Sequence, residues 1–306
     1  MKLHLIAVSF AVVVVGCGKK EAPAVPSKAP AAQQRAAAEP ERPKVSCPAK
    51  PSNAPAGPDV IGVRLGMAPA EALNVVQCES PQARITEVQA WVQGIQTHGQ
   101  KLGTQMISAK SGDAVPCDWK KTSIVDAERC QNGVVWKRVS ELVTIATPGA
   151  PGQEQVQGLW RTQRFAEGQA PTVAAAIAAL QAKYGSGGLR TKDNAPVTEP
   201  IRLDWVRDAA GQTLSPEQPR YRACAHNITA WADGSQRWTA DCGLSVAAAV
   251  VRSRTNPELA SEVHVGVADQ SKLMAVTEGL QAALDAMDAE RKQRELKGAA
   301  ETKVKL

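Results

Sequence analysis

The residues with the most definite chemistry in this sequence are its seven cysteines. Cys17 ends an apolar leader, and the other six are spread over the rest of the chain. In an oxidising compartment such as the bacterial periplasm, an even number of cysteines predicts a set of disulfide bonds. The six are Cys47, Cys78, Cys117, Cys130, Cys224 and Cys242.

Local spacing narrows the possible pairings of these six. Asp233-Gly234 lies between the strand-like segments 228–232 and 236–241 and predicts a two-residue hairpin turn, which would bring two cysteines nearly opposite each other. A short loop separates Cys117 from Cys130, which makes them a second pair. Cys47 and Cys78 are then left as the third pair. The expected pairs are Cys224–Cys242, Cys117–Cys130 and Cys47–Cys78. The alternative is a metal site, but the sequence has no C-x-x-C and its single close Cys/His pair is Cys224 with His226.

Other catalytic chemistry finds little support. The sequence has no nucleophile elbow, zinc-protease motif or P-loop. The run Gly185-Ser186-Gly187-Gly188 follows an expected helix instead of opening one, so it cannot aim N-terminal amides at a phosphate. His98, His226 and His264 are far apart in the sequence and are interpreted as surface or hydrogen-bonded core residues. We therefore predict a protein that is not an enzyme and that needs no cofactor or metal.

Tryptophan supplies most of the large aromatic surface, because the chain has seven Trp against two Tyr and two Phe. Tryptophan rings can stack on sugars or anchor a protein interface. Trp231 and Trp238 flank the expected turn and could face each other across the hairpin. They form the possible binding surface if they are exposed, and core packing is the alternative.

The spacing of apolar residues predicts an α+β fold. Two similar segments, Gly66-Met67-Ala68-Pro69 and Gly168-Gln169-Ala170-Pro171, each stand between an expected strand and an expected helix. We predict two modules, 59–150 and 151–268, each with one helix against an antiparallel sheet and possibly related as a tandem repeat. A long amphipathic C-terminal helix and a basic tail follow, at 269–306. Helices are expected at 70–77, 172–184 and 269–297, and strands at 60–65, 84–92, 104–109, 134–147, 155–165, 201–205, 221–225, 228–232, 236–241, 245–251 and 262–268.

The first 16 residues have the pattern of a signal peptide. Lys2 precedes an apolar run that is too short to span a bilayer. Val14-Val15-Gly16-Cys17 then resembles the lipobox of bacterial lipoproteins. The resemblance implies that 1–16 is removed and that Cys17 carries the lipid that anchors the protein. Gly18, in place of the Asp that retains such proteins in the inner membrane, implies the periplasmic face of the outer membrane.

Residues 17–58 are expected to hold the lipidated cysteine and a tether. Between 18 and 58 the sequence has nine Pro and eleven Ala and no Leu, Phe, Trp or Tyr, which is typical of an extended linker. The net charge of +6 falls to +5 without the leader, since Lys2 is its only charged side chain. The basic residues are scattered, so a nucleic-acid partner is not expected.

Two further resemblances concern the folded part. Residues 62–67, followed by Glu71-Ala72, resemble the opening of BamE-type outer-membrane lipoproteins, in which this segment starts a helix that packs on a small sheet. Cys242-Gly243, Asn256 to Leu259 and Asp269-Gln270 resemble the C-terminal region of uncharacterised proteobacterial lipoproteins. Both imply the cell envelope and a related fold.

These observations give one leading expectation for function. It is a lipoprotein anchored to the membrane through Cys17 that serves as a non-enzymatic interaction or envelope-assembly module, with an envelope protein or polymer as partner. The alternatives are a periplasmic ligand-binding or enzyme-inhibitor module and, third, an unrecognised hydrolase.

Overall fold

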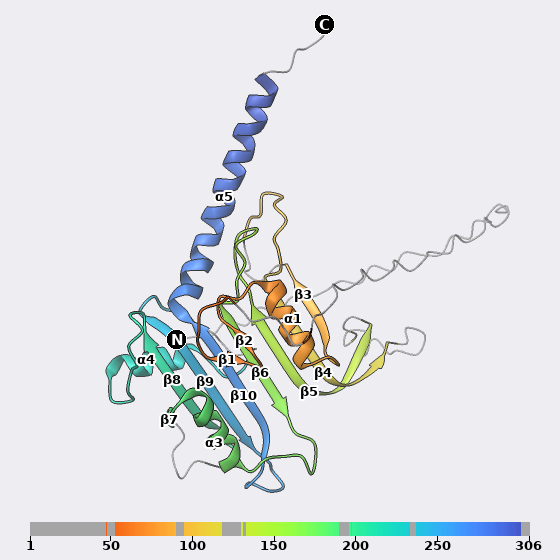
Figure 1. Cartoon of the computed structure of the whole chain (residues 1–306), viewed down its shortest axis with the longest axis vertical. Coiled ribbons are helices and arrows are strands. Elements are labelled where there is room, and N and C mark those ends of the chain that lie inside the picture. Colours follow the sequence, from red (N-terminus) through yellow and green to blue (C-terminus); the bar gives the residue numbers. More distant parts are fainter. Residues whose placement is uncertain are drawn as a thin grey trace, which may run out of the picture. The chain divides into compact units, whose positions relative to one another are not determined.

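An antiparallel sheet forms the centre of the protein (Figure 1). The computed structural model describes residues 47, 53–89, 95–117, 130, 133–189, 196, 198–232 and 237–300. Within these residues, eight strands form one sheet, and a separate two-stranded ribbon joins β1 (Asp59–Val60) to β2 (Val63–Arg64). The order across the large sheet is β3 (Arg84–Val88), β4 (Met106–Pro116), β5 (Val134–Ala146), β6 (Gly158–Arg164), β10 (Ala260–Asp269), β9 (Cys242–Arg252), β8 (Ile201–Asp208) and β7 (Gly188–Leu189).

In each half of the sheet a helix precedes four strands that pair in chain order, although in the second half a further helix, residues 219–227, stands between the second and third strands. Helix α1 (Pro69–Glu79) is followed by the meander β3 to β6, and helix α3 (Val173–Tyr184) is followed by β7 to β10. The last strands of the halves, β6 and β10, pair with each other at the centre. The predicted α+β fold is therefore confirmed. By connectivity β6 completes the first half, although it falls within 151–268. Whether the halves arose by duplication stays a prediction.

The helices lie on opposite faces of this sheet. Alternate residues of a strand point to opposite faces, and in β9 Val246, Ala248 and Val250 share a core with α1 and α3. The intervening Ala247 and Ala249 pack instead with the start of helix α5 (Gln270–Ala300). Helix α4 (Pro219–Asn227) packs on the end of β8 and β9. In Figure 1, α5 leaves the sheet where β10 ends and extends beyond it, and its residues 292–300 are exposed.

Capping residues set the starts of α3 and α5 where the sequence predicted them. Thr172 caps α3 by accepting a hydrogen bond from Ala175 N at 3.1 Å, and Gly185 follows the last turn with φ of 95°. Asp269 accepts the Lys272 N–H at 3.2 Å and so begins α5. Gly66 and Gly168, which precede α1 and α3, both have positive φ. Glycine suits both positions because it has no Cβ to clash there.

The structure corrects two expectations about local structure. The strand expected at 60–65 is the ribbon β1–β2, because Ile61 and Gly62 both adopt positive φ and reverse the chain. The strands expected at 221–225, 228–232 and 236–241 are wrong. Residues 219–227 form α4, and neither residues 228–232 nor the described residues 237–241 contain a strand. The buried residues Tyr221, Cys224 and Ala225 are spaced three and one apart, which suits a helix face. The Asp233-Gly234 turn lies outside the described residues.

Candidate functional site

A cavity of about 680 Å³ opens at the β8 side of the sheet. Its aromatic lining comes from three elements: Tyr184 at the end of α3, Trp205 in β8 and Tyr221 in α4. Lys183 and Arg207 bring positive charge to the lining. The volume lies within the range of pockets that enclose small molecules, roughly 300–1,000 Å³.

The cavity exists because the backbone pairing along the outer edge of β8 is interrupted. The short strand β7 pairs only with Leu203 and Asp204. Further along, Leu214 N donates to Val206 O at 2.8 Å, and Arg207 forms a bridge with Thr213. Between these two contacts Trp205 has no strand pairing on that side in the described part of the chain. A gap in the edge ladder therefore opens where the aromatic side chains converge.

The Gly-rich run forms one wall of this cavity and has a packing role. A Cβ on Gly187 would lie 2.3 Å from Trp205 Cε2, and one on Gly188 would lie 2.3 Å from the Tyr221 hydroxyl oxygen. Trp205 Nε1 also donates to Gly185 O at 2.9 Å. Glycine is thus required because the backbone lies directly against two aromatic side chains. The run shapes the cavity, in a role that the sequence alone did not indicate.

An ion pair between α3 and β1 forms part of the lining of the cavity on the side of α3. Lys183 Nζ lies 2.8 Å from Asp59 Oδ1, and Tyr184 Oη donates to Asp59 O at 2.9 Å. Burial tends to raise the pKa of Asp59, but hydrogen bonds from Lys183 and from the Gly62 N–H hold the pKa below its ordinary value. Burial, and then the charge of Asp59, raise the pKa of Tyr184 well above its usual range. Tyr184 therefore stays a neutral hydrogen-bond donor at physiological pH.

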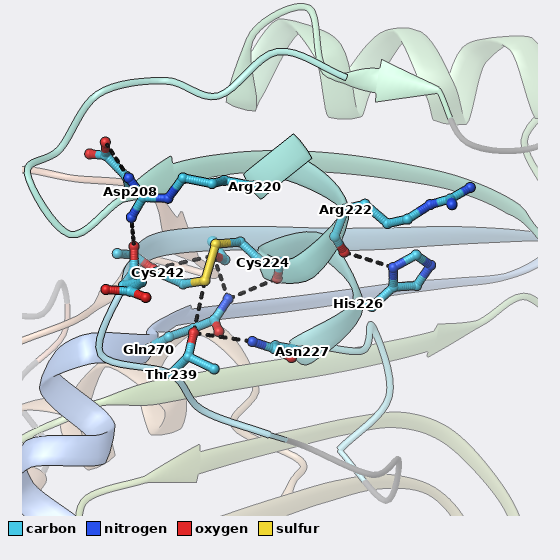
Figure 2. The surroundings of a disulfide bond; sticks show 12 residues. Asp208, Arg220, Arg222, Cys224, His226, Asn227, Thr239, Cys242 and Gln270 are labelled. Carbon is cyan, nitrogen blue, oxygen red and sulfur yellow. Dashed lines mark hydrogen bonds and ion pairs between the residues drawn. A yellow bond between two sulfur atoms is a disulfide. The ribbon is translucent and has the colours of Figure 1, made fainter. Parts of the chain in front are cut away.

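A disulfide holds the α4 wall in place (Figure 2). Cys224 in α4 is bonded to Cys242 at the start of β9. The Gln270 amide donates to Cys224 O and to Ser245 Oγ, both at 2.9 Å. Tyr221 lies one helical turn before Cys224, on the same buried face of α4. The disulfide and Gln270 together fix the helix that carries Tyr221 to the cavity.

A second, apolar groove of about 280 Å³ lies beside α3. Its walls include Ala175 and Ala179 of α3, Ile61 of the β1–β2 turn, and Val263 of β10. Lys183 and Tyr184 line this groove as well as the aromatic cavity. The two hollows therefore share a wall at the end of α3.

All six cysteines beyond Cys17 are among the described residues, and the predicted disulfides are confirmed. The structure contains Cys47–Cys78, Cys117–Cys130 and Cys224–Cys242. The third pair joins a helix to a strand, so the pairing was correct although the expected hairpin was not. Cys17 lies outside the described residues. Among those residues, no three His, Cys, Asp or Glu side chains gather as a metal site.

The three histidines lie in different surroundings. His264 is 2% exposed, and its Nδ1 lies 2.9 Å from Thr162 Oγ1 while its Nε2 lies 2.9 Å from Glu262 Oε2. The hydrogen bond from His264 is the main reason that the pKa of Glu262 is lowered. A hydroxyl, an imidazole and a carboxylate in series could activate a nucleophile. Here, however, the Trp231 ring packs on His264 with centroids 4.9 Å apart, so the group is covered.

The remaining two histidines have other hydrogen-bond partners. His98 Nε2 lies 2.6 Å from Asp285 Oδ1, which ties the loop at 95–102 to α5. His226 is exposed on α4 and bonds Arg222 O at 2.7 Å.

The possible binding surface at Trp231 and Trp238 is divided between different packing partners. Both side chains are partly buried against the core that contains the start of α5. Trp231 contacts His264, and the Arg202 guanidinium lies 5.3 Å from its ring centroid. Trp238 packs on Trp160, with centroids 6.5 Å apart. Trp231 lines only a small hollow of about 50 Å³, whereas Tyr184, Trp205 and Tyr221 form the aromatic lining of the larger cavity.

Comparison of the chain with protein-family models, with curated proteins and with solved structures found no match. None of the described helices combines the length and the apolar character needed to span a bilayer.

Sequence reasoning did not predict this cavity. Trp205 was expected in a strand and Tyr184 on the apolar face of a helix, but their convergence depends on the interrupted edge of β8. The Gly-rich run after α3 was the one local signal, because adjacent glycines often mark a close approach of the backbone to other groups.

Proposed function

We propose that the protein is a membrane-anchored envelope lipoprotein that acts as a non-enzymatic binding module, with the aromatic cavity at β8 as its ligand site. The observation that carries this proposal is the convergence of Tyr184, Trp205 and Tyr221 on one cavity of about 680 Å³. Aromatic walls combined with a few polar groups are typical of small-molecule sites. This favours the ligand-binding alternative as the activity of an envelope lipoprotein.

One observation supports binding over catalysis. In the most catalytic-looking group among the described residues, Thr162 with His264 and Glu262, the hydroxyl and the imidazole are buried, and the Trp231 ring packs on His264.

Site-directed photocrosslinking tests the proposal in envelopes that contain the full chain. Ser186 is exposed and lines the cavity, so a photoreactive amino acid there should capture the ligand. Thr255, exposed in the β9–β10 loop, is the matched control position. Crosslinking at Ser186 and not at Thr255 supports the cavity as the site. Equal yields at both positions would contradict the proposal. A Cys17→Ala background shows whether capture requires the anchor.

A second candidate function, docking of an envelope protein, is favoured by the exposed end of α5. Residues 292–300 are all exposed and extend beyond the sheet (Figure 1). A photoreactive residue at Gln293 should then crosslink to a protein. Capture of a protein at Gln293, with nothing captured at Ser186, would favour docking over ligand binding.

A further inference from the structure

The apolar groove beside α3 has features of a binding surface in its own right. Helix α3 contains one charged residue, Lys183, and its outward positions are largely alanine. A surface helix normally turns polar residues outward. Ala175 and Ala179 are exposed yet line the groove together with Phe165 and Val263, so a mostly apolar surface leads into it, with Arg161 and Lys183 as its charged side chains.

The backbone opposite α3 is unusual as well. Ile61 lines the groove and has φ of 49°, a left-handed conformation that β-branched residues rarely adopt. Asp59 supports the turn, since its Oδ1 accepts the Gly62 N–H at 2.8 Å. Positive φ at both central residues is what a two-residue hairpin turn of this type requires, so the turn itself fixes the position of Ile61 beside the groove.

The aromatic cavity next to this groove has two acidic and two basic lining residues. The Asp59 carboxylate pairs with Lys183 at 2.8 Å. Asp204 lines the cavity with carboxylate oxygens that are buried. Arg207 is exposed, and no acidic side chain in the described part of the chain forms an ion pair with it. A head group that enters the cavity therefore meets the Arg207 guanidinium at the surface, while the groove offers a mostly apolar channel.

We propose that the groove and the aromatic cavity form one site for an anionic amphiphile, with its alkyl chain along α3 and its charged head group in the cavity. The shared wall at Lys183 and Tyr184 places the junction of head group and chain at the end of α3. This inference rests on the proposed ligand-binding function and names its ligand class.

Titration with straight-chain carboxylates below their micelle concentration tests the inference. The protein is the full chain with Cys17→Ala, so that no attached lipid competes, and the readout is tryptophan fluorescence. Each added methylene should strengthen binding by about four-fold until the groove is filled, because burying a methylene group contributes about 0.8 kcal/mol. Alcohols of equal chain length should bind more weakly. An affinity independent of chain length would overturn the inference.

Two pairs of comparisons separate the parts of the site. Ala179→Phe should fill the groove and weaken the binding of long carboxylates at least ten-fold. Ala178 is exposed on the same helix outside the groove, so Ala178→Phe should not weaken their binding. Arg207→Gln should weaken the binding of carboxylates and leave the binding of alcohols unchanged. Equal effects of the two phenylalanine variants would refute the groove as the chain site.

A further comparison separates a soluble ligand from a membrane surface. Binding to phosphatidylglycerol vesicles without binding to dissolved carboxylates would overturn the inference in favour of adsorption to a bilayer. If crosslinking at Ser186 persists while carboxylates fail to bind, the ligand site stands and the amphiphile assignment falls.

Discussion

Removal of the Cys224–Cys242 disulfide should lower stability and loosen the cavity wall at the same time. The two cysteines are 18 residues apart and both sulfurs are buried. Cross-linking a loop of this length restricts the unfolded chain by about 3 kcal/mol. The variant Cys224→Ala/Cys242→Ala should lose at least that free energy of unfolding, since it also removes two buried sulfur atoms from the core around α4.

The assay is urea unfolding of the full chain under oxidising conditions, followed by tryptophan fluorescence. A loss of about 3 kcal/mol corresponds to a Tm lower by roughly 6–12 °C for a domain of this size. The matched control is Cys117→Ala/Cys130→Ala, whose loop of 13 residues predicts a similar loss of about 3 kcal/mol.

The two variants should differ at the cavity. Freeing α4 moves Tyr221, so crosslinking from Ser186 should fall only when the Cys224–Cys242 bond is absent. A Cys224→Ala/Cys242→Ala protein that loses under about 1 kcal/mol would refute the estimate of the loop entropy. Unchanged crosslinking in that variant would refute the role of the disulfide in positioning α4.

Three other predictions concern separate parts of the fold. Thr172→Ala removes the N-cap hydrogen bond of α3 and should cost about 1 kcal/mol, measured by thermal unfolding. The pKa of Asp288 is lowered to about 2, first by its hydrogen bond to Lys292, so this group stabilises the fold above its ordinary pKa of 3.8 and stops doing so as the pH falls toward 2. Circular dichroism should therefore show that Asp288→Asn flattens the acid titration of helix content. Trp231→Ala uncovers His264 and should lower the free energy of unfolding in urea by about 2–3 kcal/mol. This loss is smaller than that expected for a fully buried tryptophan, because the Trp231 ring is partly exposed.

Short-range features of the fold could be predicted from the sequence. The bounds of α3 follow from Thr172, which accepts a hydrogen bond from the first turn, and from Gly185, whose N–H donates to the last turn. The start of α5 follows from Asp269 for the same reason. Such features depend on the nearest few residues, so they hold wherever the element packs.

The boundary between helix and strand was less secure where apolar runs were short. Residues 221–225 contain Tyr, Cys and Ala in an order that fits either a strand or one helical turn. Packing of Tyr221 and Cys224 against β8 and β9 selected the helix, since it buries both side chains on one face. The Cys224–Cys242 disulfide was nevertheless predicted correctly, because the two cysteines are close in the sequence whether residues 221–225 form a strand or a helix.

Sequence alone therefore determined the caps, the cysteine pairs and the α+β class, each of which rests on spacing along the chain. Tertiary structure decided that β6 pairs with β10, that Trp231 covers His264, and that Trp205 opens onto a cavity. Those outcomes depend on contacts between residues that can be more than a hundred positions apart, as in Thr162 with His264. The favourable free energy of these contacts arises only when the whole sheet has assembled, because no local segment can bury those surfaces by itself.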